Sequence, residues 1–304
     1  MSLLVITGPT ASGKTSRAVD CAKAFGGEII SADSRQIYRN MDLGTGKDLE
    51  EYDGVPYHLI DIAPAGYKYN LYEYLRDAGN ARRDIVERGR LPILCGGTGL
   101  YVESVLKGLQ LPEVPENQSL RRSLESKTLD ELTAILSSMK SLHNTTDVDT
   151  CKRAIRAIEI ATYYIEHPEA ASKAQPHPIS DAVIVGVAID RDHRRSRISA
   201  RLEARMKAGM TEEVERLLAQ GIAPDDLIYY GLEYKFLTLY VTGRMTKGEM
   251  LVQLETAIHQ FAKRQMTWFR GMERRGFPIH WLAWDLPRDE FVEEIARLLQ
   301  HIPS

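Results

Sequence analysis

The segment GPTASGKT at Gly8–Thr15, directly after the apolar run LLVIT at Leu3–Thr7, decides the fold of this chain. It matches the P-loop pattern GxxxxGK[ST], and it stands where that pattern has meaning, between a predicted strand and a predicted helix over Lys14–Phe25. Glycines let backbone N–H groups turn inward around an anion, and the helix N-terminus adds partial positive charge. The alternative is a glycine-rich turn with a surface lysine.

The segment therefore predicts a phosphate site in which Lys14 supplies a full charge and the Thr15 hydroxyl is a ligand of Mg²⁺. We expect all eight residues to take part in binding: Gly8, Pro9, Thr10, Ala11, Ser12, Gly13, Lys14 and Thr15. A P-loop alone does not name the substrate, since NTPases, small-molecule kinases and diphosphate-using transferases all carry one.

Three further apolar runs read as buried strands: EIISA at 28–32, LPILC at 91–95 and AVIVGVAI at 182–189. They alternate with segments of helical spacing, among them 194–208, 211–219 and 247–271. This alternation indicates an α/β fold, a P-loop NTPase-like parallel sheet with helices on both faces.

The character of the chain changes near Pro112, where two polar helical stretches follow at 117–139 and 149–166. The segment AQPHPISD at 174–181 reads as a linker back to the sheet. We therefore predict a catalytic domain made of 1–111 and 181–304, interrupted by a helical insertion domain at 112–180. The alternative is that these helices simply cover the sheet.

Composition limits the classes of function. The formal net charge of −3 is balanced, so any RNA contact must come from local basic patches. The 3 cysteines are isolated and lack metal-ligand spacing, which favours reduced thiols in a cytoplasm. We find no secretory leader and no apolar run of about 18 residues, so we expect a cytoplasmic protein without a membrane span.

Two polar residues follow other predicted strands and should face the P-loop, since ligands of such sheets bind beyond the carboxyl ends of the strands. Asp33 could hold Mg²⁺, accept a proton from a nucleophile, or cap the next helix. Thr98, within GGTGLY at Gly96–Tyr101, could contact a phosphate or a substrate, or cap the following helix.

At this point the chain resembles the bacterial tRNA dimethylallyltransferases, and the resemblance covers nearly its whole length. The Asp33–Lys47 stretch is the most specific, because ordinary P-loop kinases lack it. The matching motifs are GPTASGKT at Gly8–Thr15, DSRQIYRNMDLGTGK at Asp33–Lys47, YHLID at Tyr57–Asp61, GGTGLY at Gly96–Tyr101, RAIRAIEI at Arg153–Ile160 and AKRQMTWFR at Ala262–Arg270.

The resemblance implies transfer of a dimethylallyl group from dimethylallyl diphosphate to N6 of adenosine 37 of tRNA, next to the anticodon. Asp33 would then be the base or orienting acceptor for the adenine amine, and Thr98 would contact donor and target nucleotide. Lys14, Thr15 and Mg²⁺ would neutralise the leaving diphosphate. Contacts to the tRNA anticodon stem-loop are implied for Asp33, Ser34, Arg35, Gln36, Thr98, Arg121, Lys152, Arg153 and Arg156. We expect a monomer.

Three positions depart from the family pattern: Glu233 stands where a glycine is usual, and Glu215 and His259 where arginines are frequent. We expect a basic rim of the diphosphate site rebuilt by Arg216 or Lys235, or no consequence if the local alignment is shifted. The alternative functions are a prenyltransferase acting on free adenine nucleotides, a small-molecule kinase using ATP, and a tRNA-binding protein that has lost turnover.

Overall fold

The computed structural model describes residues 2–141, 146–173 and 175–301. The chain divides into two compact units, one made of Met1–Lys107 with Pro178–Ser304 and the other of Gly108–His177. The predicted helical insertion, 112–180, coincides with most of the second unit. Each unit is described by itself below.

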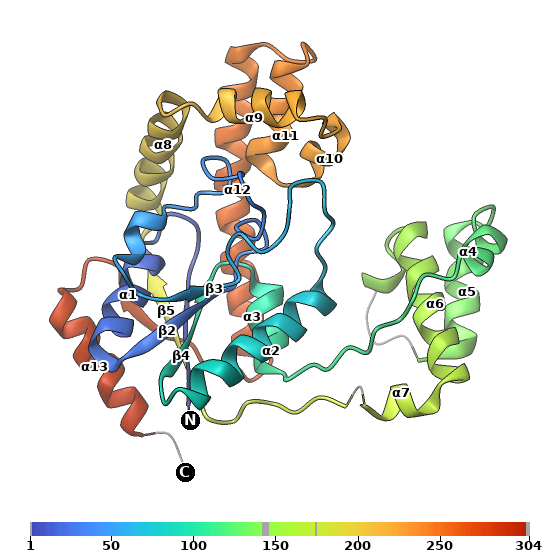
Figure 1. Cartoon of the computed structure of the whole chain (residues 1–304), viewed down its shortest axis with the longest axis horizontal. Coiled ribbons are helices and arrows are strands. Elements are labelled where there is room, and N and C mark those ends of the chain that lie inside the picture. Colours follow the sequence, from blue (N-terminus) through green and yellow to red (C-terminus); the bar gives the residue numbers. More distant parts are fainter. Residues whose placement is uncertain (1, 142–145, 174, 302–304) are drawn as a thin grey trace. The chain divides into compact units, whose positions relative to one another are not determined.

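A six-stranded parallel sheet organises the first unit (Figure 1). Its order is β3-β2-β4-β1-β5-β6. The strands are β1 (Leu3–Thr7), β2 (Gly27–Ser31), β3 (Tyr57–His58), β4 (Leu91–Gly96), β5 (Ala182–Ala188) and β6 (His280–Ala283). The predicted P-loop-like α/β fold is confirmed, and the P-loop follows the central strand β1.

Strand alternation explains why helices cover both faces of the sheet. Along β1, Leu3 and Val5 belong to one hydrophobic core, while Leu4 and Ile6 belong to another. The first core includes side chains of α2 (Leu71–Glu87), α3 (Gly99–Leu106) and α12 (Lys247–Arg274). The second core includes side chains of α1 (Lys14–Phe25) and α13 (Arg288–Gln300).

Four shorter helices extend the first core beyond the sheet. They are α8 (Arg191–Lys207), α9 (Met210–Ala219), α10 (Pro224–Tyr229) and α11 (Leu232–Val241). Figure 1 shows α9, α10 and α11 beside the part of α12 that projects past the strands, and α11 packs against α12. The same long helix thus reaches from this helical cluster to the sheet.

The two edge strands of the sheet, β3 and β6, were not predicted from the sequence. β3 has two residues, and β6 has no fully buried residue. Neither strand therefore shows the continuous apolar run by which the four inner strands were predicted. A short single-turn 3-10 helix, η1 (Leu49–Tyr52), precedes β3.

The second unit is helical, with α4 (Gln118–Leu124), α5 (Leu129–Met139), η2 (Thr146–Val148), α6 (Cys151–Glu166) and α7 (Pro168–Lys173). The prediction of a single helical stretch over 117–139 is wrong, because the helix is interrupted between α4 and α5. Thr128 and Glu131 form a capping box there, which starts a new helix. Leu124, Leu132 and Ile158 lie in a small core of this unit.

Candidate active site

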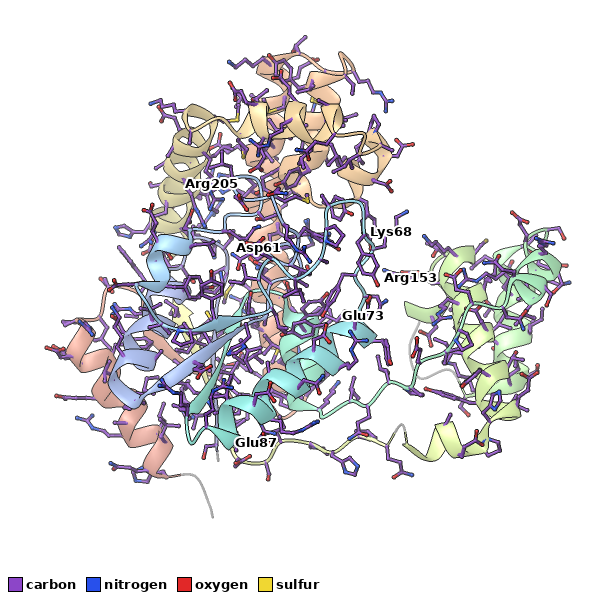
Figure 2. All side chains as sticks on the ribbon, in the orientation of Figure 1. Asp61, Lys68, Glu73, Glu87, Arg153 and Arg205 are labelled. Carbon is purple, nitrogen blue, oxygen red and sulfur yellow. The ribbon has the colours of Figure 1, made fainter. Side chains whose placement is uncertain are left out.

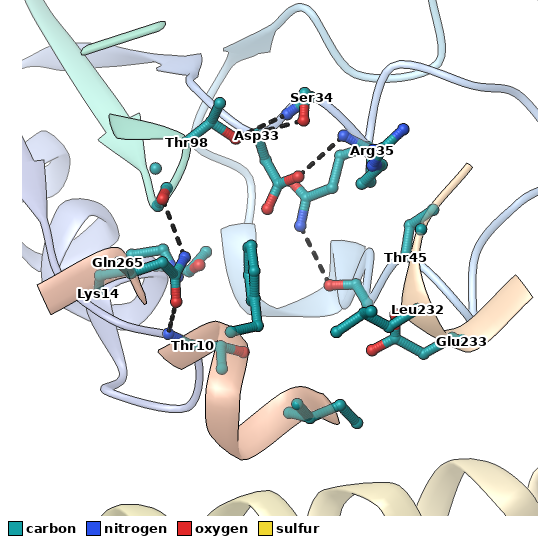
Figure 3. A pocket seen from close by; sticks show the side chains of 18 of the residues that line it. Thr10, Lys14, Asp33, Ser34, Arg35, Thr45, Thr98, Leu232, Glu233 and Gln265 are labelled. Atoms are coloured by element: carbon teal, nitrogen blue, oxygen red, sulfur yellow. Dashed lines mark hydrogen bonds between the residues drawn. The ribbon is translucent and has the colours of Figure 1, made fainter. Parts of the chain in front are cut away.

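A pocket of about 510 Å³ opens where β1, β2 and β4 end (Figure 3). The segments that follow these three neighbouring strands line it, and so do residues of α8, α11 and α12. Of the sequence-predicted residues, Thr10, Lys14, Thr15, Asp33, Ser34, Arg35, Gln36 and Thr98 are brought together here. The parallel topology therefore assembles the expected cluster.

The P-loop keeps the N-terminus of α1 open to an anion. Gly13 precedes the helix with φ 85°, and no side chain caps the first turn. Gly8 and Ala11 also have positive φ, 155° and 63°, so three residues of the loop adopt such values, a conformation that turns N–H groups inward. The first N–H groups of α1 are thus unpaired by side chains and available to phosphate oxygens.

Lys14 is the cation of this loop. Burial lowers the pKa of its ammonium from the ordinary value, while the neighbouring Cys95 and Asp33 act in the opposite direction. A partly desolvated ammonium gains from an anion that replaces its lost water. Lys14 is therefore placed and poised to bind a phosphate oxygen.

Asp33 and Thr98 both line the pocket, and neither side chain caps a helix. Asp33 Oδ1 accepts a hydrogen bond from the Arg35 N–H at 2.9 Å, which fixes the carboxylate within its own turn. Thr98 precedes α3 without a side-chain cap, and its Oγ1 instead accepts from the Ser34 N–H at 3.1 Å. The hydrogen bond from Ser34 to Thr98 thereby joins the loop after β2 to the loop after β4 (Figure 3). The second carboxylate oxygen of Asp33 remains available to a ligand.

Gln265 of α12, which sequence reasoning did not single out, connects the two glycine-rich loops. Its Oε1 accepts from the Thr10 N–H at 2.8 Å, and its Nε2 donates to the Gly97 carbonyl at 2.9 Å (Figure 3). It belongs to the AKRQ motif, so its signal was present in the sequence, but only the fold shows that its amide joins the P-loop to the Thr98 loop.

The basic wall of the pocket comes from α8. Arg201 and Arg205 line the pocket and both donate to Asp48 Oδ2, at 2.7 and 3.2 Å. Burial and the neighbouring Arg201 lower the pKa of Arg205, which Figure 2 labels on α8. Two adjacent guanidinium groups, only partly neutralised, suit an anion with several charges.

The expected rebuilding of the rim by Arg216 or Lys235 is wrong, since neither residue lines the pocket. Both are exposed, and Lys235 lies over the ring of Phe236. Of the three unusual positions, only Glu233 lines the pocket; Glu215 is exposed, and His259 lies 3.7 Å from Glu255. The arginines that do line the pocket, Arg201 and Arg205, are one helical turn apart in the sequence. The sequence alone did not show which face of α8 lies toward the P-loop.

If the pocket binds the diphosphate donor that the motifs imply, Glu233 should make donor binding depend on pH. Burial raises the pKa of its carboxyl group and nearby Asp33 adds to this, while its own N–H, Arg205 and Arg201 act against it. Because the pKa is raised, the group loses its proton at a higher pH than usual, and the new charge then repels a diphosphate. We expect the dissociation constant of the donor to rise about tenfold as Glu233 ionises, from a single like charge.

Calorimetric titration of the donor between about pH 5 and pH 8 tests this expectation. The same series on Glu233→Gln is the control, since ionisation of the diphosphate itself affects both proteins equally. Parallel pH curves for the two proteins would contradict the assignment.

One side of the pocket is apolar. Leu100, Ile258, Phe261 and Trp268 line it, three of them on α12. A Cβ atom on Gly99 would lie 2.2 Å from Cδ1 of Trp268, which explains the glycine at this point of the GGTG sequence. The pocket therefore places an apolar wall beside a carboxylate and a phosphate cradle.

The second unit holds the remaining residues that were predicted to contact tRNA. Arg121 pairs with the buried Glu159 through Nε at 3.0 Å and Nη2 at 2.9 Å, and Arg156 pairs with the same carboxylate and donates to the Val114 carbonyl. Both arginines thus stabilise the unit internally. Lys152 is exposed on α6, and Arg153, labelled in Figure 2, is exposed and pairs with Asp149.

Across the described residues, no helix is long and apolar enough to cross a membrane. Within the same ranges, no group of three or more His, Cys, Asp or Glu side chains is arranged to hold a metal ion.

Sheet and pocket together define a P-loop protein in which the loop opens beside a carboxylate and an apolar surface. Comparison with known proteins gives the family. A model described as IPP transferase matches residues 36–272, and one described as Isopentenyl transferase matches residues 1–54. The chain belongs to the IPP transferase family, as the motifs predicted, and it is an enzyme of prenyl transfer.

Close relatives agree. The chain is 62% identical to tRNA dimethylallyltransferase 2 of Bacteroides fragilis over 302 residues, 98% of each chain. It is 57% identical to tRNA dimethylallyltransferase 1 of Parabacteroides distasonis over 303 residues, again 98% of each. Its fold matches the crystal structure of the full-length tRNA isopentenylpyrophosphate transferase from Bacillus halodurans with a TM-score of 0.71 and 33% identity, over 98% of this chain and 97% of that one.

Proposed function

We propose that this enzyme transfers a dimethylallyl group from dimethylallyl diphosphate to N6 of adenosine 37 in tRNA. One observation carries the proposal: a single pocket joins Lys14 of the P-loop, the Asp33 carboxylate and an apolar wall that includes Trp268. These three features match the diphosphate, the amine and the prenyl group of the reaction. A kinase acting on a polar substrate has no need of the third.

The site must first stabilise the diphosphate leaving group. As the bond between the allylic carbon and diphosphate breaks, negative charge grows on the phosphate oxygens, and preorganised cations stabilise it. Lys14, the open N-terminus of α1, Arg201 and Arg205 supply that stabilisation. The apolar side chains hold the five-carbon group and exclude water from the electron-poor carbon.

Mg²⁺ fits this site as a partner of the diphosphate rather than as a metal held by the protein alone. The pocket offers the Thr15 hydroxyl and the carboxylates of Asp48 and Glu51, all hard oxygen ligands. Mg²⁺ typically binds through a few such oxygens together with substrate phosphates and water. When bound, the ion neutralises charge on the leaving diphosphate; Thr15 is the residue we assign to it.

Asp33 serves the acceptor. The adenine amine is a weak nucleophile and must be oriented and relieved of a proton. With one oxygen held by the Arg35 N–H, the other oxygen of Asp33 is free to accept that proton. Thr98 lies beside Ser34 and contacts donor and target nucleotide in this arrangement, and Ser34, Arg35 and Gln36 line the acceptor side.

A base inside a tRNA loop reaches such a pocket only if it is turned out of the stack. We propose that the helical insertion contacts the anticodon stem-loop through the exposed Lys152 and Arg153, with Arg121 and Arg156 supporting them through Glu159. We further propose that the protein acts as a monomer, and we assign it to the cytoplasm, where its tRNA substrate is found.

Charge reversal tests the role of the insertion. Lys152→Glu with Arg153→Glu should weaken tRNA binding and reduce the slope of log affinity against log salt by about two, one for each lost phosphate contact. Donor binding should be unchanged. Arg288→Glu with Arg297→Glu, two exposed residues of α13, is the matched control. Equal salt slopes for both double variants would show that this face of α6 is only solvated surface.

Acceptor competition tests the proposed function itself. The enzyme is incubated with labelled dimethylallyl diphosphate, Mg²⁺, unmodified tRNA and an excess of AMP and ATP. We expect the label in tRNA and not in the nucleotides. Label in AMP or ATP would favour the free-nucleotide prenyltransferase, and transfer of phosphate from ATP would favour a kinase.

A further inference from the structure

Glu213, on α9, binds the backbone of a loop that lines the pocket. Its Oε2 accepts from the N–H groups of Asp42 and Leu43, both at 2.9 Å, and its Oε1 accepts from the Gly44 N–H at 3.0 Å. The Tyr234 hydroxyl donates to the same Oε1 at 2.6 Å. Glu213 is 2% exposed, so four donors surround a carboxylate that is removed from water.

These contacts hold the DLGTGK motif, the most specific part of the sequence, for which the proposed function gave no role. Gly44, Thr45 and Gly46 line the pocket. The Gly46 carbonyl accepts from Gln36 Nε2 at 3.1 Å and from Arg201 Nη2 at 3.3 Å. The loop therefore connects the acceptor side of the site with its basic wall.

Both glycines of this loop lie too close to their neighbours to carry a side chain. A Cβ on Gly44 would lie 2.6 Å from Cζ of Tyr234, and one on Gly46 would lie 2.2 Å from Nη2 of Arg205. The pocket wall is thus made of backbone packed directly on Tyr234 and Arg205. Glu213 fixes the 42–44 part of this backbone, and the Gly46 N–H in turn donates to the Asp42 carbonyl at 2.9 Å.

We propose that Glu213 is a positioning residue for prenyl transfer, an inference that rests on the proposed function. Glu213 fixes the Gly44–Gly46 wall, and through the Gly46 carbonyl it positions the side chains of Gln36 and Arg201. The carboxylate itself does not line the pocket. Burial and the neighbouring Glu213 raise the pKa of Tyr234, so its hydroxyl remains a donor to this carboxylate. The alternative is that Glu213 only stabilises the fold.

The experiment compares Glu213→Gln with Glu28→Gln. An amide at position 213 must present an NH₂ group to backbone N–H donors, which frees the loop. Glu28 is the matched control, a carboxylate 4% exposed and bound by His58 and Arg88, which does not line the pocket. Hydrogen exchange of the 42–44 amides and steady-state kinetics for donor and tRNA are measured on both variants, well below their unfolding temperatures.

For Glu213→Gln we expect exchange of the 42–44 amides to be about tenfold faster, and kcat/KM to fall by about ten- to a hundredfold, as for misplaced site groups. Glu28→Gln should lose thermal stability while keeping both quantities within about twofold of the parent. Tyr234→Phe should change them in the same direction as Glu213→Gln but less, and it replaces that variant if Glu213→Gln does not fold.

Faster exchange with unchanged kinetics would overturn the proposal, because the loop would then be free without consequence for catalysis. Unchanged exchange would also overturn it, because Glu213 would not hold the loop. If the parent enzyme itself transfers no prenyl group to tRNA, the proposed function fails, whereas the exchange comparison still reports whether Glu213 holds the loop.

Discussion

Replacing Lys14 by Ala is expected to lower kcat/KM for the donor by about two to three orders of magnitude, the range found when a preorganised charge is removed from an active site. Lys14 is the half-buried cation of the P-loop, next to the open N-terminus of α1. Its ammonium interacts with the diphosphate before and during bond breaking, so donor affinity and turnover should fall together. Steady-state kinetics at limiting donor concentration measure the effect.

Lys235→Ala is the matched control, because Lys235 is exposed and does not line the pocket. It should behave like the parent enzyme. Unchanged turnover of Lys14→Ala at low donor concentration would show that the P-loop does not hold the diphosphate.

Asp33→Asn should reduce turnover by about two orders of magnitude or more, the usual contribution of a general base. The substitution keeps the shape of the side chain and the oxygen that accepts from the Arg35 N–H, and it removes only the charge and the proton acceptor. Because the carboxylate acts on the amine, affinity for the donor with Mg²⁺ should change little. Single-turnover rates and donor calorimetry on the same preparations separate the two quantities.

The opposite result would assign Asp33 to the metal. If calorimetry shows that donor binding with Mg²⁺ is lost while the chemical step proceeds at the parental rate, Asp33 holds the ion and another group takes the proton.

The inner strands and the phosphate site could be predicted because each leaves a local signal. Buried parallel strands read as continuous apolar runs, and the P-loop is a contiguous motif between a strand and a helix. Asp33 and Thr98 directly follow strands, so the topology of a parallel sheet brings them to one edge. The positions of Asp33 and Thr98 directly after predicted parallel strands therefore suffice to predict that they lie at the same edge of the sheet as the P-loop.

Arg201, Arg205, Glu213 and Gln265 could not be placed in this way. They lie on helices 100 or more positions further along the chain than the loops they contact, and helical periodicity indicates only that one face is buried. Which strand loop meets that face depends on how α8, α9 and α12 pack, a tertiary property. The same limit produced the mistaken expectation for Arg216 and Lys235, which was based on proximity in sequence.

The arginines of the second unit show a related limit. Arg121, Arg153 and Arg156 look alike as basic residues of polar helices, yet two of them bind the buried Glu159 and one pairs with an exposed aspartate. A sequence gives charge and spacing, whereas the choice between an internal ion pair and a nucleic-acid contact depends on where the counter-charge is buried.

Locating the transferred group within tRNA tests the central claim most directly. Unmodified tRNA is incubated with the enzyme, labelled dimethylallyl diphosphate and Mg²⁺, then digested and analysed by mass spectrometry, beside a tRNA carrying guanosine instead of adenosine at position 37. We predict one prenyl group per tRNA, on N6 of adenosine 37, and none on the guanosine variant. Equal labelling of both tRNAs, or label confined to free adenine nucleotides, would contradict the account.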